Sequence, residues 1–134
     1  MYVDACAIVA VLADEAGATR VSDALTRATT PVTSSIAILE AALALARPDK
    51  FDVTVADAGA IIEEFLCERA ITVRDLPPAA ETTRLALEAA LRFRGGRHGL
   101  NLGDCLHYAC ARHYSVPILA TADEYRQTDL DVVD

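Results

Sequence analysis

The chain has 134 residues and a mass of 14.3 kDa, the size of one domain with its own hydrophobic core, and its 53% hydrophobic content excludes disorder as the main state. No apolar run approaches the ~20 residues of a membrane span, and the N-terminus lacks the basic start of a signal peptide, so we expect one soluble, cytoplasmic domain over residues 1–134. The formal net charge of −8 disfavours nucleic acid as a partner unless the basic residues cluster.

Short strands alternate with helices along the chain. Strands are predicted at 2–4, 31–34, 70–73, 116–119 and 130–133, and helices at 5–12, 17–28, 36–46, around 61–66, at 77–94 and at 102–113. Ser35 is expected to cap the third of these helices, and Gly95-Gly96 to end the long one. This alternation predicts an α/β fold in which helices cover both faces of a parallel sheet.

Four acidic residues stand in or beside segments that otherwise have the pattern of buried structure: Asp4, Glu40, Asp104 and Asp123. The first three are the only formally charged residues within 1–13, 31–46 and 99–111, and the fourth follows the apolar strand 116–119. A buried carboxylate costs several kcal/mol unless another group compensates it. These positions therefore need a structural or a functional explanation.

Taken singly, local structural roles are the favoured explanation of three of them. Asp4 could cap the helix that begins at residue 5, and Asp123 could cap the turn that follows it. Asp104 could complete a capping box opened by Asn101.

Glu40 is harder to explain by capping because it lies inside a predicted helix. Helical spacing places it close to Ile36 and Leu43, on the apolar stripe. A solvated face is therefore excluded, and a buried ion pair with Arg47, the nearest basic residue in the sequence, remains open.

Joint placement favours a functional site. In an open parallel sheet, ligands bind beyond the carboxyl ends of the strands, and all four acids converge on one cleft there if the first and fourth strands are neighbours. Carboxylates a few Å apart cannot all ionise without a compensating cation. Oxygen ligands suit Mg²⁺ or Mn²⁺, and such a centre is typical of phosphodiester hydrolysis.

Over essentially its whole length the chain resembles a PIN-domain ribonuclease of the VapC toxin type. The segments that carry this resemblance are Met-Tyr-Val-Asp at 1–4, Ser-Ser-Ile-Ala-Ile-Leu-Glu-Ala at 34–41, Gly-Arg-His-Gly-Leu-Asn-Leu-Gly-Asp-Cys at 96–105 and Leu-Ala-Thr-Ala-Asp-Glu-Tyr at 119–125. The resemblance implies that Asp4, Glu40 and Asp104 are metal-binding acids and that Asp123 is a less regular fourth.

The same resemblance implies a fold, an activity and partners. The fold is a five-stranded parallel sheet in the order 3-2-1-4-5 between helices. The activity is Mg²⁺- or Mn²⁺-dependent cleavage of RNA that blocks translation, performed by a homodimer and neutralised by a VapB-type antitoxin. Small hydroxyl residues usually follow the first acid in this family, whereas here Ala5 and Cys6 stand there. The alternative is a catalytically weak PIN scaffold that acts through its antitoxin- and DNA-bound complex.

Basic residues cluster just before Asp104 and are predicted to position RNA: Arg92, Arg94, Arg97 and His98. Residues 84–98 hold four Arg and one Glu, whereas residues 121–134 hold five acids and one Arg, so we expect a basic stripe and an acidic end. Cations that stabilise the negative pole of a solvated helix end are an equally good explanation of this cluster.

Three polar residues are predicted to assist the acids from beside them: Cys6, Asn101 and Thr121. His107, one turn after Asp104, is expected to be a packing or surface residue and not a ligand, with a role in orienting Asp104 as the alternative. Tyr108 and Tyr125 are expected in the core or at the rim of the site, with stacking on RNA bases as the alternative.

Overall fold

The computed structural model describes residues 1–96 and 99–133. Its strands are β1 (Tyr2–Val3), β2 (Val32–Ser34), β3 (Thr72–Arg74) and β4 (Ile118–Leu119). Its helices are α1 (Ala5–Leu12), α2 (Ala18–Arg27), α3 (Ser35–Leu45), α4 (Val55–Glu68), α5 (Ala79–Phe93), α6 (Leu102–Tyr114) and the 3₁₀ turn η1 (Glu124–Gln127). Within these ranges no helix is long and apolar enough to cross a membrane.

The strands form one parallel sheet in the order β3-β2-β1-β4, which confirms the expected order of the first four strands. Tyr2, in the central strand β1, sets the register of the sheet, because it lies opposite both Val32 in β2 and Ile118 in β4. The fifth predicted strand, at 130–133, is reduced to an isolated parallel bridge between Val132 and Ile118. Each strand is only two or three residues long, so the helices supply most of the packing surface.

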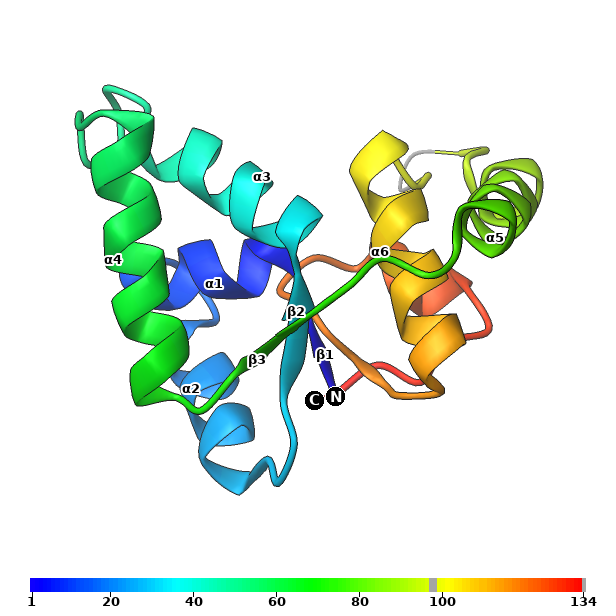
Figure 1. Cartoon of the computed structure of the whole chain (residues 1–134), viewed down its shortest axis with the longest axis horizontal. Helices are drawn as coiled ribbons and strands as arrows, with labels where there is room; N and C mark the ends of the chain where they lie inside the picture. Colours follow the sequence, from blue (N-terminus) through cyan, green and yellow to red (C-terminus); the bar gives the residue numbers. More distant parts are fainter. Residues whose placement is uncertain (97–98, 134) are drawn as a thin grey trace.

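Two hydrophobic cores flank the sheet. One is built from α1, α2, α3 and α4, and the other from α5, α6 and the residues around β4. Figure 1 shows the first four helices on one side of the strands and α5 with α6 on the other. This three-layer arrangement buries both faces of the sheet, as the apolar strands β1 and β4 require.

The carboxyl ends of β1 and β2 lead directly into helices. Asp4 alone separates β1 from α1, and α3 starts at the residue after β2 ends. Helix α6, which belongs to the opposite layer, packs against α3. The N-terminal parts of α1, α3 and α6 therefore meet at one end of the sheet (Figure 1).

The cap of α3 differs from the expectation. Ser34, and not Ser35, is its N-cap residue, and its side chain makes no capping hydrogen bond in the described part of the chain. The Ser34 hydroxyl instead bonds to the Tyr2 hydroxyl at 2.7 Å, because both side chains are fully buried and each needs a partner.

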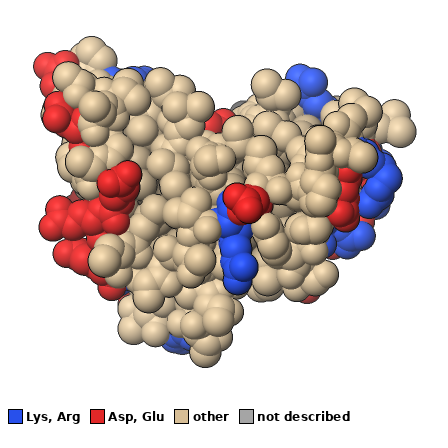
Figure 2. All heavy atoms as spheres, in the orientation of Figure 1, with Lys and Arg blue, Asp and Glu red and all other residues tan. Residues whose placement is uncertain are grey.

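The basic stripe and the acidic end are both present, but they contact each other. Arg92 on α5 pairs with Asp129 at 3.0 Å and with Glu88 at 2.9 Å. Figure 2 accordingly shows basic and acidic side chains mixed on the side of the molecule where α5 lies, and mainly acidic ones on the side of α4. Opposite charges that are separate in sequence thus partly neutralise each other.

Candidate active site

A cleft of about 370 Å³ opens where α1, α3 and the start of α6 meet. Three of the four predicted acids line it: Asp4, Glu40 and Asp104. The other lining residues are Ala5, Cys6, Val9, Glu15, Ala44, Arg47, Lys50 and Asn101. The structure therefore brings together acids that are up to 100 positions apart in the sequence.

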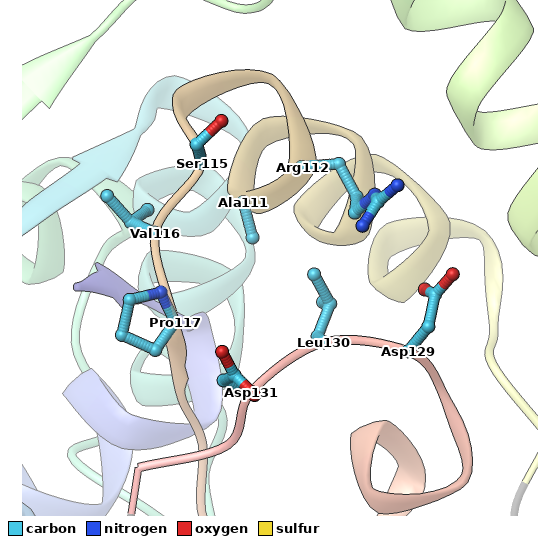
Figure 3. Close-up of a pocket in the computed structure, with 8 residues that line it drawn as sticks. All are labelled: Ala111, Arg112, Ser115, Val116, Pro117, Asp129, Leu130 and Asp131. Carbon is cyan, nitrogen blue, oxygen red and sulfur yellow. The ribbon is translucent and has the colours of Figure 1, made fainter.

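A second cleft, of about 340 Å³, lies between the C-terminal part of α6 and the chain before β4. Figure 3 shows Arg112 next to Asp129 in this cleft, with Asp131 beside Pro117. Asp129 already accepts hydrogen bonds from Tyr108 and Arg92, so its carboxylate is committed to the fold. The acid-lined cleft at the carboxyl ends of the strands is therefore the candidate site.

Asp4 has both a structural and a site-facing role. Its Oδ1 accepts the backbone N–H of Cys6 at 2.8 Å and so caps α1, as capping predicted. Its Oδ2 accepts the hydroxyl of Tyr125 at 2.6 Å. The side chain is only 5% exposed. Capping and a place in the cleft are thus compatible, because a carboxylate has two oxygens.

Asp104 follows the same principle. Its Oδ2 accepts the backbone N–H of Asn101, whose side chain in turn accepts the N–H of Asp104, so the expected capping box is formed. Its Oδ1 lies 3.4 Å from the Tyr125 hydroxyl. Burial raises the pKa of Asp104; the hydrogen bond from Asn101 opposes this, and the charges of Asp4 and Glu124 raise it further. The surroundings of Asp104 therefore disfavour the negatively charged form of its carboxylate.

Glu40 has a partner that sequence reasoning missed. Its Oε2 lies 2.5 Å from Nε2 of His107, which is 1% exposed, whereas Arg47 pairs with Asp49. The alternative that Glu40 forms a buried ion pair with Arg47 is therefore wrong. The position of Glu40 on the apolar stripe of α3 was the available signal, but the sequence could not show that α6 would pack against that stripe.

His107 is held from both sides of its ring. Nδ1 lies 2.9 Å from the Tyr2 hydroxyl, and Nε2 contacts Glu40 and stands 4.0 Å from Oδ2 of Asp4. Burial lowers the pKa of His107, but the nearby charges of Asp4 and Glu40 and the hydrogen bond to Glu40 outweigh it, so the net effect is to raise the pKa. Of the packing and surface positions expected for His107, the structure shows the packed one, and the carboxylate that its ring contacts belongs to Glu40 and not to Asp104.

Asp123 and its neighbour Glu124 lie differently from the expectation. The Asp123 side chain is 76% exposed, pairs with Arg126 at 3.2 Å, and is not among the described residues that line the cleft. Glu124 is close enough to raise the pKa of Asp104, and its Oε2 is buried without a hydrogen-bond partner within residues 1–96 and 99–133. Two consecutive acids after β4 were the sequence signal, but only the turn at η1 decides which one faces inward.

Of the residues predicted to contact RNA, the two that the structure describes, Arg92 and Arg94, do not line the cleft. Arg92 is occupied by its two acidic partners on α5 and near the C-terminus. Arg94 ends α5, is exposed, and lies near enough to Cys105 to lower the pKa of that thiol, although burial raises it overall. Arg97 and His98 fall outside the described residues. The cations that do line the cleft, Arg47 and Lys50, were not predicted.

The predicted assisting residues lie at the cleft. Cys6 and Asn101 line it, and the backbone N–H of Thr121 donates to Sγ of Cys6 at 3.3 Å. Burial, followed by the charge of Asp4, raises the pKa of Cys6 to about 12, so its thiol stays protonated at neutral pH. Tyr108 and Tyr125 are both buried, which favours the core role over stacking on bases.

The donor set fits a hard divalent cation in its chemistry. Asp4, Glu40 and Asp104 offer oxygen ligands, burial penalises the charge of Asp104, and Glu124 has a buried oxygen that lacks a hydrogen-bond partner among the described residues. As the side chains lie, no three of the His, Cys, Asp and Glu groups within the described ranges are placed to hold one ion. Asp4 and Asp104 are instead both in contact with the Tyr125 hydroxyl, so a cation would have to compete with these contacts.

Comparison with known proteins shows the family to which this chain belongs. The PIN domain profile matches residues 1–131. Ribonuclease VapC36 of Mycobacterium tuberculosis is 36% identical over 98% of this chain and 91% of its own, and Ribonuclease VapC28 of the same organism is 34% identical over 96% and 93%. The crystal structure of Mycobacterium tuberculosis VapC20, described as a toxin that cleaves the sarcin-ricin loop, shares the fold with a TM-score of 0.74 at 14% identity, covering 96% of this chain and 95% of that one. The chain therefore belongs to the PIN-domain family, among the VapC ribonucleases.

Proposed function

We propose that the protein is a toxin that hydrolyses phosphodiester bonds of RNA with Mg²⁺ or Mn²⁺ and so inhibits translation, and that a VapB-type antitoxin neutralises it. The observation that carries this proposal is the convergence of Asp4, Glu40 and Asp104 from three separate elements on one cleft. Relatives that match over nearly the whole chain and are named VapC ribonucleases support it.

The three acids would hold the cation. When bound, it would stabilise the negative charge on the scissile phosphate and lower the pKa of the attacking water. The Tyr125 hydroxyl bridges Asp4 and Asp104. Burial and these two carboxylates raise the Tyr125 pKa well above its usual value, so this hydroxyl remains a donor at any working pH. Tyr125 thus keeps two like charges at a fixed separation.

Positive charge at the cleft would orient the RNA backbone. Arg47 and Lys50 line the cleft beside the acids, each paired with one acid, Asp49 and Glu15 respectively, and Arg94 is exposed at the end of α5. Arg94, with Arg97 and His98 after it, is proposed to contact phosphate groups, and Arg92 to contribute less because two acids already pair with it. The working form is proposed to be a cytoplasmic homodimer.

The decisive experiment follows cleavage of a mixed RNA pool by antitoxin-free protein in EDTA, Mg²⁺ and Mn²⁺. Asp104→Asn is the test variant, and Glu64→Gln, on the solvent side of α4, is the matched control. We expect cleavage only with a divalent ion, lost in Asp104→Asn and kept in the control. Cleavage in EDTA, or cleavage by Asp104→Asn at the wild-type rate, would contradict the proposal.

The catalytically weak scaffold is the second candidate, because a protonated Cys6 thiol occupies the place where relatives usually carry a hydroxyl. It predicts antitoxin binding without RNA cleavage under any divalent ion. A Cys6→Ser variant that gains cleavage would assign the weakness to that position.

The fourth acid is proposed to be either Asp123 or Glu124, and a paired substitution separates them. Asp123→Asn removes an exposed carboxylate, whereas Glu124→Gln removes the one whose charge reaches Asp104. We expect Glu124→Gln to reduce cleavage more strongly. The reverse order would return the role to Asp123.

A further inference from the structure

The carboxylate of Glu40 rests directly on the backbone of α6. Gly103 is buried, and a β-carbon built on it would lie 2.7 Å from Cδ of Glu40 and overlap its Oε1. The absence of a side chain at position 103 is therefore what leaves room for the Glu40 carboxylate.

One turn further along the same helix, His107 holds that carboxylate from the other side. Residues four apart share one face of a helix, so Gly103 and His107 flank the same space. The ring Nε2 of His107 contacts Oε2 of Glu40 at 2.5 Å.

Buried hydroxyls fix the ring of His107 in turn. The Tyr2 hydroxyl lies 2.9 Å from Nδ1 and 2.7 Å from the hydroxyl of Ser34, and all three side chains are at most 1% exposed. Tyr2 lies in the central strand β1 and pairs with both neighbouring strands, so the ring is anchored to the centre of the sheet. Glu40 itself is 40% exposed and would otherwise sample several rotamers.

We propose that Gly103 and His107 form a cradle that fixes the Glu40 carboxylate in the cleft, which makes His107 a positioning residue for the metal-dependent reaction. The inference rests on the proposed function, because it assigns Glu40 a place among the metal-holding acids. His107 reaches the cation only through Glu40. Partners of this kind around a ligand typically change metal affinity 10- to 100-fold.

The first test measures Mn²⁺ affinity by electron paramagnetic resonance. Gly103→Ala should bind Mn²⁺ at least about 10-fold more weakly, because its methyl group displaces the Glu40 carboxylate. Its metal-free thermal stability should not fall, because Ala favours a helix over Gly and Glu40 can turn toward solvent. Gly59→Ala is the matched control, since a β-carbon there meets nothing within 4 Å.

The second test replaces the histidine. His107→Leu should weaken Mn²⁺ binding to a similar extent, and His107→Gln, whose side-chain amide can donate to Glu40, should restore most of the affinity. On a Glu40→Gln background His107→Leu should change Mn²⁺ affinity less than about twofold, because its effect passes through Glu40. His113→Leu, on the same helix but paired with Glu81, controls for loss of a histidine.

A double-mutant cycle on unfolding in EDTA separates this inference from the proposed function. The changes in the free energy of unfolding caused by His107→Leu and Glu40→Gln should be non-additive in the double variant. Additive changes would overturn the cradle whether or not metal binds. If the Gly103→Ala and His107→Leu variants fold and bind Mn²⁺ with wild-type affinity, the cradle is overturned and the proposed function remains intact. A wild-type protein that binds no Mn²⁺ would overturn the metal-dependent function and, with it, the positioning role.

Discussion

The hydroxyl of Tyr125 donates to Oδ2 of Asp4 at 2.6 Å, although the two residues are 121 positions apart in the chain. Asp4 directly follows the central strand β1, and Tyr125 lies in the turn η1 after β4. Because β1 and β4 are neighbours in the sheet, their carboxyl ends place the two side chains together. This contact joins the N-terminal acid to the C-terminal segment.

Tyr125→Phe should lower the free energy of unfolding in EDTA by about 1–3 kcal/mol, because it leaves an oxygen of the buried Asp4 without its donor. Urea denaturation measures this change. Tyr114→Phe is the matched control, since its hydroxyl donates to the carbonyl of Asp75 at the surface, and it should cost about 0.5 kcal/mol or less. Equal losses in the two variants would contradict a special role for the Tyr125 contact.

Asp104→Asn should keep or raise the metal-free melting temperature. The amide oxygen can still accept the N–H of Asn101, while the unfavourable charge beside Asp4 and Glu124 is removed. The rise in melting temperature on adding Mg²⁺ should disappear with the ligand. Differential scanning fluorimetry with and without Mg²⁺ gives both values. A marked fall in the metal-free protein would show that Asp104 is mainly a structural cap.

Arg94→Ala should weaken RNA binding and reduce the slope of log affinity against log salt by about 0.7, as expected for one phosphate contact on a single strand. Arg92→Ala should change the slope less, because its guanidinium is held by Glu88 and Asp129. Fluorescence anisotropy on labelled RNA with Asp104→Asn as the common background avoids cleavage. Equal slopes for Arg94→Ala and its parent would remove this residue from the RNA path.

Asp129→Asn should destabilise the protein at neutral pH and lose that effect in acid. Burial opposes ionisation of Asp129, but the hydrogen bonds from Tyr108 and Arg92 outweigh it, so its pKa is lowered. A lowered pKa stabilises the fold above the unfolded value of 3.8, and this stabilisation is lost as pH falls through the folded value. Urea denaturation of both proteins at pH 7 and below pH 3.8 checks the sign. A difference that grows toward acid would contradict it.

Cysteine labelling should separate one thiol from the others in the native protein. Cys67 is exposed, whereas Cys105 and Cys110 are buried and Cys6 has a pKa of about 12. At pH 8 a disulfide reagent should modify Cys67 rapidly and the other three only after unfolding, as mass spectrometry of the labelled peptides would show. Rapid labelling of Cys6 would mean that its thiol ionises more readily than its surroundings indicate.

Local structure was predictable because it depends on neighbours in the sequence. The capping box of Asn101 and Asp104 and the cap at Asp4 use residues two or three positions apart, and both form as expected. Alternation of apolar segments predicted the parallel sheet, since its buried strands need apolar residues on both faces. The fifth strand was not confirmed, because 130–133 reaches β4 through a single bridge.

Sequence alone also identified which acids interrupt buried segments, and the structure places three of them in one cleft. It could not identify their partners. The partner of Glu40 is His107 and not Arg47, because α6 packs on α3. The acid near Asp104 is Glu124 and not Asp123, because the direction of the turn η1 decides which of the two faces inward. Periodicity and composition determine which residues must be buried; only the meeting of distant elements determines which charge a buried carboxylate faces.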